Sequence, residues 1–255
     1  MKIQFLLKNT GMYERLGIMT LSSVLKGKGH EVQLLLSEEL GEDEIIRKVK
    51  IYKPHILAYS IMTGEHSYHI ELNKMVRTQY EEALSVFGGP HPTYTPGMIH
   101  DEYVDAICRG EGEIYFPQLI EKYSKNEDYF NTPNFWFKKK DGSIIKNELG
   151  DLVEDLDKLP NPDRKLMYDA DTQLSARGQK LFMSNRGCPY KCTYCFNHAY
   201  NKMTKGHGDM MRYRSVDSVI EEIKEVKDNY FLDRVNIDDD IFLLKPKGWL
   251  EEFAE

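Results

Sequence analysis

The sequence of 255 residues has only four cysteines and no long hydrophobic run. No stretch approaches the roughly 18 apolar residues of a membrane span. The N-terminal segment turns polar after Leu7, too soon for the apolar core of a signal peptide. We therefore expect a cytoplasmic protein with no membrane partner. In that reducing compartment the four cysteines are expected to be free thiols, metal ligands or redox groups rather than disulfides.

The net charge of −7 argues against a nucleic-acid partner, but the charge is unevenly distributed. Residues 177–214 contain eight Lys or Arg against one acid, Asp209, so this segment carries +7 and the rest of the chain −14. Such a basic segment is either a solvated face or a site for an anionic ligand.

Short apolar runs alternate with amphipathic segments over the first 125 residues. The runs predict strands at 2–7, 31–36, 55–60, 84–89 and 105–110, and helical spacing follows at 17–30, 42–53, 65–80 and 113–125. The Pro-rich stretch after Gly89 predicts only a short or irregular helix. This alternation predicts an α/β fold with a doubly wound, flavodoxin-like parallel sheet. The length of the chain suits two domains.

Ligands of such sheets bind beyond the carboxyl ends of the strands. Four of the predicted loops there place glycine beside serine, threonine or other polar residues, and glycine lets the backbone approach a ligand closely. No G-x-G-x-x-G follows the first strand, which argues against a dinucleotide site. The candidate binding residues are Asn9, Thr10, Gly11, Gly17, Ser60, Met62, Thr63, Gly88, Gly89, Pro90, His91, Thr93, Gly110, Glu111, Gly112 and Glu113.

Residues 1–124 resemble the cobalamin-binding domain that precedes many radical S-adenosylmethionine (SAM) enzymes. The stretches "FGGPHPTYTP" (87–96) and "ICRGEGE" (107–113) carry the resemblance most specifically. It implies that the loops bind cobalamin. Many cobalamin proteins carry D-x-H-x-x-G, whose histidine ligates cobalt, and none of the eight histidines stands in that pattern. The resemblance therefore implies base-off cobalamin without a histidine ligand. The alternative is a flavodoxin-like domain with a different ligand or none.

Residues 126–175 are predicted as a linker between a first domain, 1–125, and a second, 176–255. A hairpin is expected to turn at Asp141 and Gly142, and the stretch 155–166 is polar and interrupted by prolines. The same family commonly shows an L-P-x-P-like linker at this place. Cys108, at the end of an apolar strand, is expected to be a buried structural cysteine.

The other three cysteines, Cys188, Cys192 and Cys195, lie within "RGCPYKCTYCFNH". A structural zinc needs four ligands, and only His198 stays open as a fourth. A thioredoxin-like redox pair lacks the third cysteine. Three thiolates would leave one iron of a 4Fe-4S cluster open. The stretch "GCPYKCTYCFN", with Tyr194 before the last cysteine, closely resembles the signature of radical SAM enzymes. The resemblance implies that S-adenosyl-L-methionine binds the open iron and is cleaved to a 5′-deoxyadenosyl radical.

Downstream residues extend the resemblance into the first part of a partial, TIM-like (β/α) barrel. Ser215 is predicted to cap a helix over 217–226, and the run 234–242 to form the second barrel strand, ending in acids. In the family the end of that strand reaches the amino group of SAM, so Asp239 and Asp240 are candidates. Asp238 stays open because the register is uncertain, and three acids also suit a solvated turn or a metal site. Arg212 and Arg214 match the family pattern, although surface salt bridges explain them almost as well.

The resemblances together imply a cobalamin-dependent radical SAM methyltransferase. It would act on an unactivated carbon or phosphorus of a small-molecule substrate, with an electron donor such as flavodoxin or ferredoxin. The alternatives are an oxidative cyclase or ring-rearranging enzyme with the same cofactors, a tRNA methylthiotransferase, and a non-catalytic cobalamin- or cluster-binding fragment. The tRNA enzymes usually carry three further cysteines in their first domain.

The length of the second domain sets a further expectation. From Lys180 only 76 residues remain, enough for two strand–helix units at about 30 residues each. The family uses about six such units. We expect that the chain by itself supports at most slow turnover.

Overall fold

The computed structural model describes residues 1–255, which divide into two compact units. Unit 1 consists of Met1–Gly150 and Pro162–Ala170, and unit 2 consists of Asp151–Asn161 and Asp171–Glu255. The predicted α/β fold class is confirmed. None of the helices combines the length and the apolar character that crossing a membrane requires.

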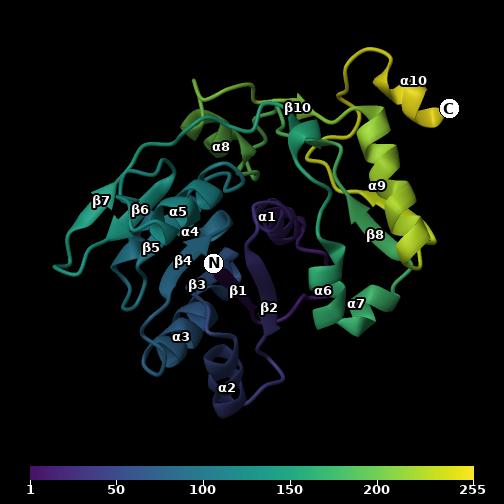
Figure 1. The fold of residues 1–255 in the computed structure, drawn as a ribbon. Helices are drawn as coiled ribbons and strands as arrows, with labels where there is room; N and C mark the ends of the chain where they lie inside the picture. The colour runs from purple at the N-terminus through teal and green to yellow at the C-terminus, as the bar shows by residue number, and fades with distance from the viewer. The chain divides into compact units, whose positions relative to one another are not determined.

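Unit 1 is built on a seven-stranded sheet in the order β2-β1-β3-β4-β5-β6-β7 (Figure 1). The first five strands pair in parallel, whereas β6 and β7 are antiparallel. The strands are β1 (Lys2–Leu7), β2 (Glu31–Leu36), β3 (Ile56–Ser60), β4 (Leu84–Gly88), β5 (Ala106–Cys108), β6 (Phe135–Lys138) and β7 (Ile144–Lys146). The five strands predicted from the sequence are therefore present, with bounds that shift by at most two residues.

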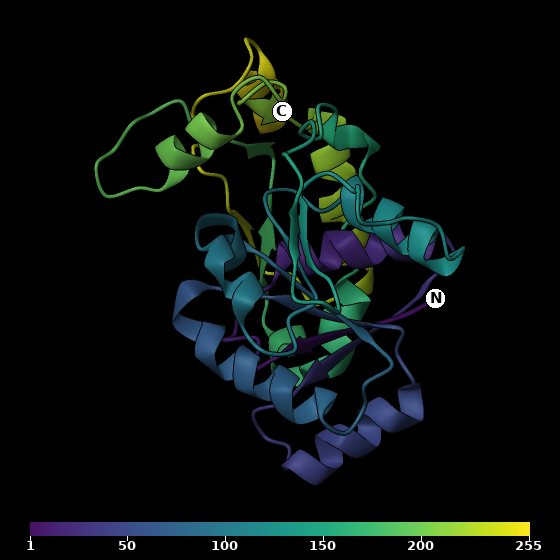
Figure 2. The same cartoon turned by 90° about the vertical axis from the view of Figure 1, so that its left-hand side faces the viewer.

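Helices cover both faces of this sheet. They are α1 (Leu16–Gly27), α2 (Glu42–Tyr52), α3 (His66–Arg77), α4 (Pro90–Tyr94), α5 (Tyr115–Ser124) and α6 (Arg164–Ala170), with 3₁₀ turns at Thr63–Glu65 and Pro96–His100. Phe5 of β1 belongs to the core cluster shared with α1, α5 and α6, and its neighbour Leu6 to the cluster shared with α2 and α3. Figure 2 shows α2 and α3 side by side. A sheet buried on both faces explains why its strands read as continuous apolar runs.

The predicted hairpin forms, but it belongs to the sheet. Gly142 N–H donates to Lys139 O at 2.9 Å, and the Asp141 carboxylate accepts the Ser143 N–H at 2.9 Å, which closes the turn. Phe135 is fully buried, and its strand β6 pairs with β5. Part of the stretch expected as a linker, 126–150, is therefore an extension of unit 1.

Unit 2 pairs β8 (Gln179–Phe182) with β11 (Arg234–Ile237) in parallel and β9 (Asn185–Arg186) with β10 (Arg212–Tyr213) in antiparallel. Its helices are α7 (Thr172–Ala176), α8 (Asn197–Met203), α9 (Val216–Asn229) and α10 (Trp249–Ala254), with a 3₁₀ turn at Leu156–Lys158. Ser215 caps α9 as predicted, because its Oγ accepts the Ser218 N–H at 3.2 Å. The order strand, helix, parallel strand is that of a (β/α) barrel.

Candidate functional site

The strand order of unit 1 creates a switch point between β1 and β3. The chain runs from β1 to β2 on one side and then to β3 on the other. Ligands of such sheets bind beyond the carboxyl ends of the strands at this point. The sixteen predicted binding residues follow β1, β3, β4 and β5, or lie in the adjoining first turns and strand ends. Because these four strands are parallel, the residues gather at one edge of one sheet.

The loop after β4 requires glycine at position 89. Gly89 has φ +92°, and a Cβ there would lie 2.9 Å from Ile61 N. The Ile61 N–H donates to Gly88 O at 2.9 Å, and the His91 N–H donates to Ile61 O at 3.1 Å. The loops after β3 and β4 are therefore joined by their backbones, and only glycine permits this close approach.

Two buried side chains hold the same edge in place. The Thr93 Oγ1 donates to Gly89 O at 2.8 Å and accepts the Gly110 N–H at 3.1 Å, so it links the loops after β4 and β5. The His91 ring stacks on His66 with centroids 4.3 Å apart. Burial, with a smaller effect of His66, lowers the pKa of His91. Thr93 and His91 thus shape the edge from within rather than presenting their side chains to a ligand.

Exposed apolar side chains surround the glycine loops. Gly11 and Met12, in the loop after β1, both have positive φ, +63° and +62°. Met12, Tyr13, Met62 and Tyr94 are exposed large apolar residues of these loops. Of these only Met62 was predicted, because exposure of an apolar side chain leaves no mark in the sequence. Bare backbone beside exposed apolar groups suits a large ligand with apolar faces.

A buried ion pair holds the loop after β1 in place. Glu14 and Arg164 are both buried, and the Arg164 Nη1 lies 2.9 Å from Glu14 Oε1. The Tyr168 hydroxyl also donates to this carboxylate. Glu14 and Arg164 lie 150 residues apart in the sequence, and no local pattern predicts such a pairing. A buried carboxylate needs partners of this kind.

The three cysteines of unit 2 occupy one loop between β9 and α8. All are free thiols; Cys188 is buried, Cys192 is exposed and Cys195 is half-buried. A four-iron cluster carries its thiolates on separate iron atoms. Three free thiols on one short loop suit such a cluster.

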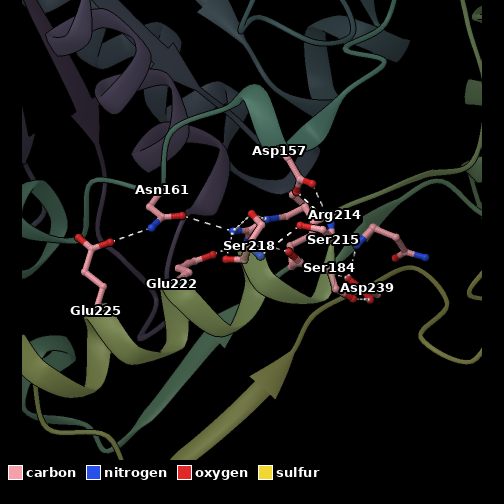
Figure 3. A network of polar contacts seen from close by, with 11 residues as sticks. Asp157, Asn161, Ser184, Arg214, Ser215, Ser218, Glu222, Glu225 and Asp239 are labelled. Carbon is pink, nitrogen blue, oxygen red and sulfur yellow. Dashed lines mark hydrogen bonds and ion pairs between the residues drawn. The ribbon is translucent and has the colours of Figure 1, made fainter. Parts of the chain in front are cut away.

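The three acids after β11 have different surroundings. Asp238 and Asp240 are exposed. The Asp239 side chain is fully buried, accepts the Ser184 N–H at 2.7 Å and forms an ion pair with Lys245 at 2.8 Å (Figure 3). Asp239 is thus engaged by donors of the chain itself, and Asp240 is the more open of the two predicted candidates.

Both arginines of the predicted family pattern are structural. The Arg212 side chain is buried and donates to Val153 O at 2.9 Å. The Arg214 side chain pairs with the buried Glu222 (Figure 3). It also donates to Met183 O at 3.2 Å. Arg214 therefore forms a salt bridge, as one interpretation expected, but the pair is mostly buried rather than at the surface. Lys180, also in the basic segment, is buried against carbonyls of α7, so this segment is not simply a solvated face.

Comparison with known proteins finds a family similar to the part of unit 1 that contains the glycine loops. The family model described as the B12 binding domain matches residues 6–120. Residues 6–120 are thus similar to a B12-binding domain, and we refer to them by that name. This domain contains all four glycine loops, and the likeness expected from the sequence is confirmed.

The relatives extend beyond the B12-binding domain. An uncharacterized methyltransferase of Pyrococcus horikoshii is 27% identical over 91% of this chain and 50% of its own length. An anaerobic magnesium-protoporphyrin IX monomethyl ester cyclase of Synechocystis is 25% identical over 94% of this chain and 48% of its own length. The chain thus spans about half the length of these curated relatives.

A solved structure shares the fold. The cobalamin-dependent SAM radical enzyme OxsB, determined with aqua-cobalamin and SAM bound, matches 98% of this chain and 35% of its own chain with a TM-score of 0.77 and 19% identity. The match spans the B12-binding domain and unit 2.

Two histidines beside the loop after β3 are engaged by groups of the chain itself. The buried His69 accepts the Lys8 N–H through Nε2 at 3.3 Å and donates through Nδ1 to Glu65 O at 2.9 Å. His66 contacts Thr63 O through Nδ1 and Ser67 Oγ through Nε2.

Cys108 is buried in β5, and burial strongly raises the pKa of its thiol. This environment suits a structural cysteine.

Proposed function

We propose that the protein is a cobalamin-dependent radical SAM enzyme, and specifically a methyltransferase. The observation that carries the proposal is the presence, in one chain, of a B12-binding domain and of three free thiols in a C-x₃-C-x₂-C loop that begins six residues after a parallel strand. A methyl carrier and a site for an open-iron cluster are the two components that such chemistry needs.

The residues of the chain take distinct roles in this proposal. The glycine loops and the exposed Met12 and Met62 bind cobalamin without a histidine ligand. Cys188, Cys192 and Cys195 hold the 4Fe-4S cluster, and Asp240 lies at the strand end that would meet the amino group of SAM. When bound, the reduced cluster supplies the electron that cleaves SAM to a 5′-deoxyadenosyl radical, and cobalamin supplies the methyl group.

The substrate class and electron donor are also proposals. We assign a small-molecule substrate with an unactivated carbon or phosphorus centre, and a flavodoxin or ferredoxin as donor. The methyltransferase of Pyrococcus horikoshii supports methylation. The chain corresponds to about half of that protein, so the activity proposed is that of a protein with the rest of the barrel.

An oxidative cyclase is the second candidate, favoured by the cyclase of Synechocystis, which aligns with 94% of this chain. The two reactions differ in the fate of the SAM methyl group. With SAM labelled in that methyl, a methyltransferase places label in the product, whereas a cyclase releases an unlabelled, oxidised product.

Reconstitution of the full chain tests the cluster. We expect anaerobically reconstituted protein to bind about four irons, as a 4Fe-4S cluster requires. Replacing Cys188, Cys192 or Cys195 with Ala should abolish this binding. The matched control is Cys108→Ala, which should leave the iron content unchanged. Zinc in place of iron after anaerobic purification would contradict the proposal.

A further inference from the structure

A buried ion pair within the loop after β11 also contacts the segment that follows β8. Lys245 Nζ lies 2.8 Å from an oxygen of Asp239, and both side chains are 0% exposed. The same ammonium donates to Ser184 Oγ at 2.5 Å. Asp239 also accepts the backbone N–H groups of Ser184, at 2.7 Å, and Asn185, at 3.0 Å. Figure 3 shows Asp239 beside Ser184. One carboxylate thus binds two successive amides and a lysine.

The ammonium of Lys245 is enclosed on its other sides by aromatic rings. Its Nζ lies 4.7 Å from the ring centre of Trp249, 5.2 Å from Phe242 and 5.8 Å from Tyr213. Such rings stabilise a desolvated cation. Lys247, two residues later, is exposed. A buried ion pair often adds little net stability over an apolar pair, so stability alone does not account for this one.

The residues that Asp239 holds, Ser184 and Asn185, lie shortly before the cysteine loop. Asn185 and Arg186 form β9, and Arg186 pairs with Arg212 of β10. The next residue, Gly187, has φ +93°, and a Cβ there would collide with Met210 O. Cys188 follows, and its carbonyl accepts the Asn201 side-chain amide at 2.8 Å. The backbone is therefore constrained at each residue from Ser184 to Cys188.

We propose that Lys245, Asp239 and Ser184 form a clamp that positions Cys188. The clamp makes Cys188 the fixed thiol of the three, whereas Cys192, exposed on the outer part of the loop, adjusts to what is bound. Lys245 is a positioning residue and touches no reacting atom. The value of this arrangement for a cluster rests on the proposed function, but the placement of Cys188 does not.

The reactivity of each thiol in the full-length, reduced, metal-free chain tests the clamp. The variants are Lys245→Met, the double variant D239N/K245M and the control Lys247→Met, which removes a charge from an exposed lysine. Iodoacetamide alkylation is followed at each cysteine by mass spectrometry. We expect the rate at Cys188 to rise about tenfold in both clamp variants, because local opening governs access to a buried group. Cys192 and Cys195 should change by less than about twofold, and K247M should match the wild type.

The double variant guards against simple unfolding, because it leaves no unpaired buried charge. An unchanged rate at Cys188 in both clamp variants would overturn the proposal. An equal rise at all three cysteines in the double variant would also overturn it, because the clamp would then support unit 2 as a whole.

A second readout separates this inference from the proposed function. In reconstituted protein, K245M should bind as much iron as the wild type but lose it to a chelator several-fold faster, by about the factor seen at Cys188. If the selective rise at Cys188 is found and wild-type protein binds no cluster, the clamp is supported and the proposed function is wrong. Iron loss from K245M at the wild-type rate, despite a bound cluster, would overturn the clamp.

Discussion

Gly89 shows how a single residue sets the shape of the cobalamin edge. Its positive φ and the absence of a side chain allow the β4 loop to lie against the backbone of Ile61. Gly97, on the 3₁₀ turn that follows, has no atom within 4 Å of a built Cβ and no positive φ. The two glycines thus differ in whether a side chain could be added: at position 89 it would clash and require a strained φ, whereas at position 97 it would do neither.

We predict that Gly89→Ala weakens cobalamin binding by about five- to 150-fold, since the strain of a residue at positive φ, of order 1–3 kcal/mol, must be relieved by moving the loop. Gly97→Ala is the matched control and should bind as the wild type does. Titration of cob(II)alamin, followed by its absorbance, gives both dissociation constants. Equal affinities for the two variants would show that the loop does not form the site.

We expect the buried His69 to make the stability of unit 1 depend on pH. Burial lowers its pKa, so protonation below the ordinary histidine pKa of about 6.5 favours the unfolded state. Stability present above that pH is therefore lost as the pH falls toward the folded-state pKa. We predict that the unfolding midpoint falls between pH 7 and pH 5, and that His69→Gln makes this fall smaller by a few °C, or about 1 kcal/mol.

Thermal unfolding followed by circular dichroism at the two pH values measures this difference. His91 has a lowered pKa of the same sign, so the H69Q variant should keep part of the pH dependence. An unchanged dependence in H69Q would mean that another group controls the acid response.

At the scale of elements, the B12-binding domain needs more chain than its family match covers. The match ends at residue 120, but β6 covers the outer edge of β5, and the buried Phe135 and Phe137 complete the core. Helix α6 provides Arg164 for Glu14. These parts come from a stretch that the sequence presents as a linker.

We predict that a fragment ending at Ser124 is unstable, because losing each buried Phe costs about 3–5 kcal/mol and Glu14 loses its partner. A fragment ending at Ala170 should fold and bind cobalamin. Soluble yield, circular dichroism and cobalamin retention on gel filtration compare them. A stable, cobalamin-binding fragment 1–124 would show that the hairpin and α6 are dispensable.

The difference between local and distant signals explains what the sequence could predict. The strands of the parallel sheet, the Ser215 cap and the cysteine loop follow from periodicity and spacing, which are local. The pairing of β6 with β5 and the ion pair between Asp239 and Lys245 depend on contacts that form only in the folded chain. For that reason Asp239 and Asp240 look equivalent in the sequence and differ in the structure.

At the scale of the whole molecule, the residues proposed for cobalamin and for the cluster fall in separate compact units. We predict that Cys192→Ala abolishes cluster binding and leaves the cobalamin affinity of the full chain within about twofold of the wild type, as expected for independent sites. Cobalamin titration of C192A and wild-type protein, both metal-free, checks this. A large loss of cobalamin affinity in C192A would reveal coupling between the two sites.

Unit 1 is discontinuous in sequence, since residues 162–170 return to it after the chain has entered unit 2. This has a consequence for the growing chain. Glu14 is made near the start of synthesis, but its partner Arg164 is added some 150 residues later, about 10–30 seconds at ribosomal rates. Throughout that interval Glu14, in the loop after β1, lacks the arginine with which it pairs in the folded chain. A nascent chain therefore acquires a finished cobalamin edge only after the start of unit 2 has been synthesised.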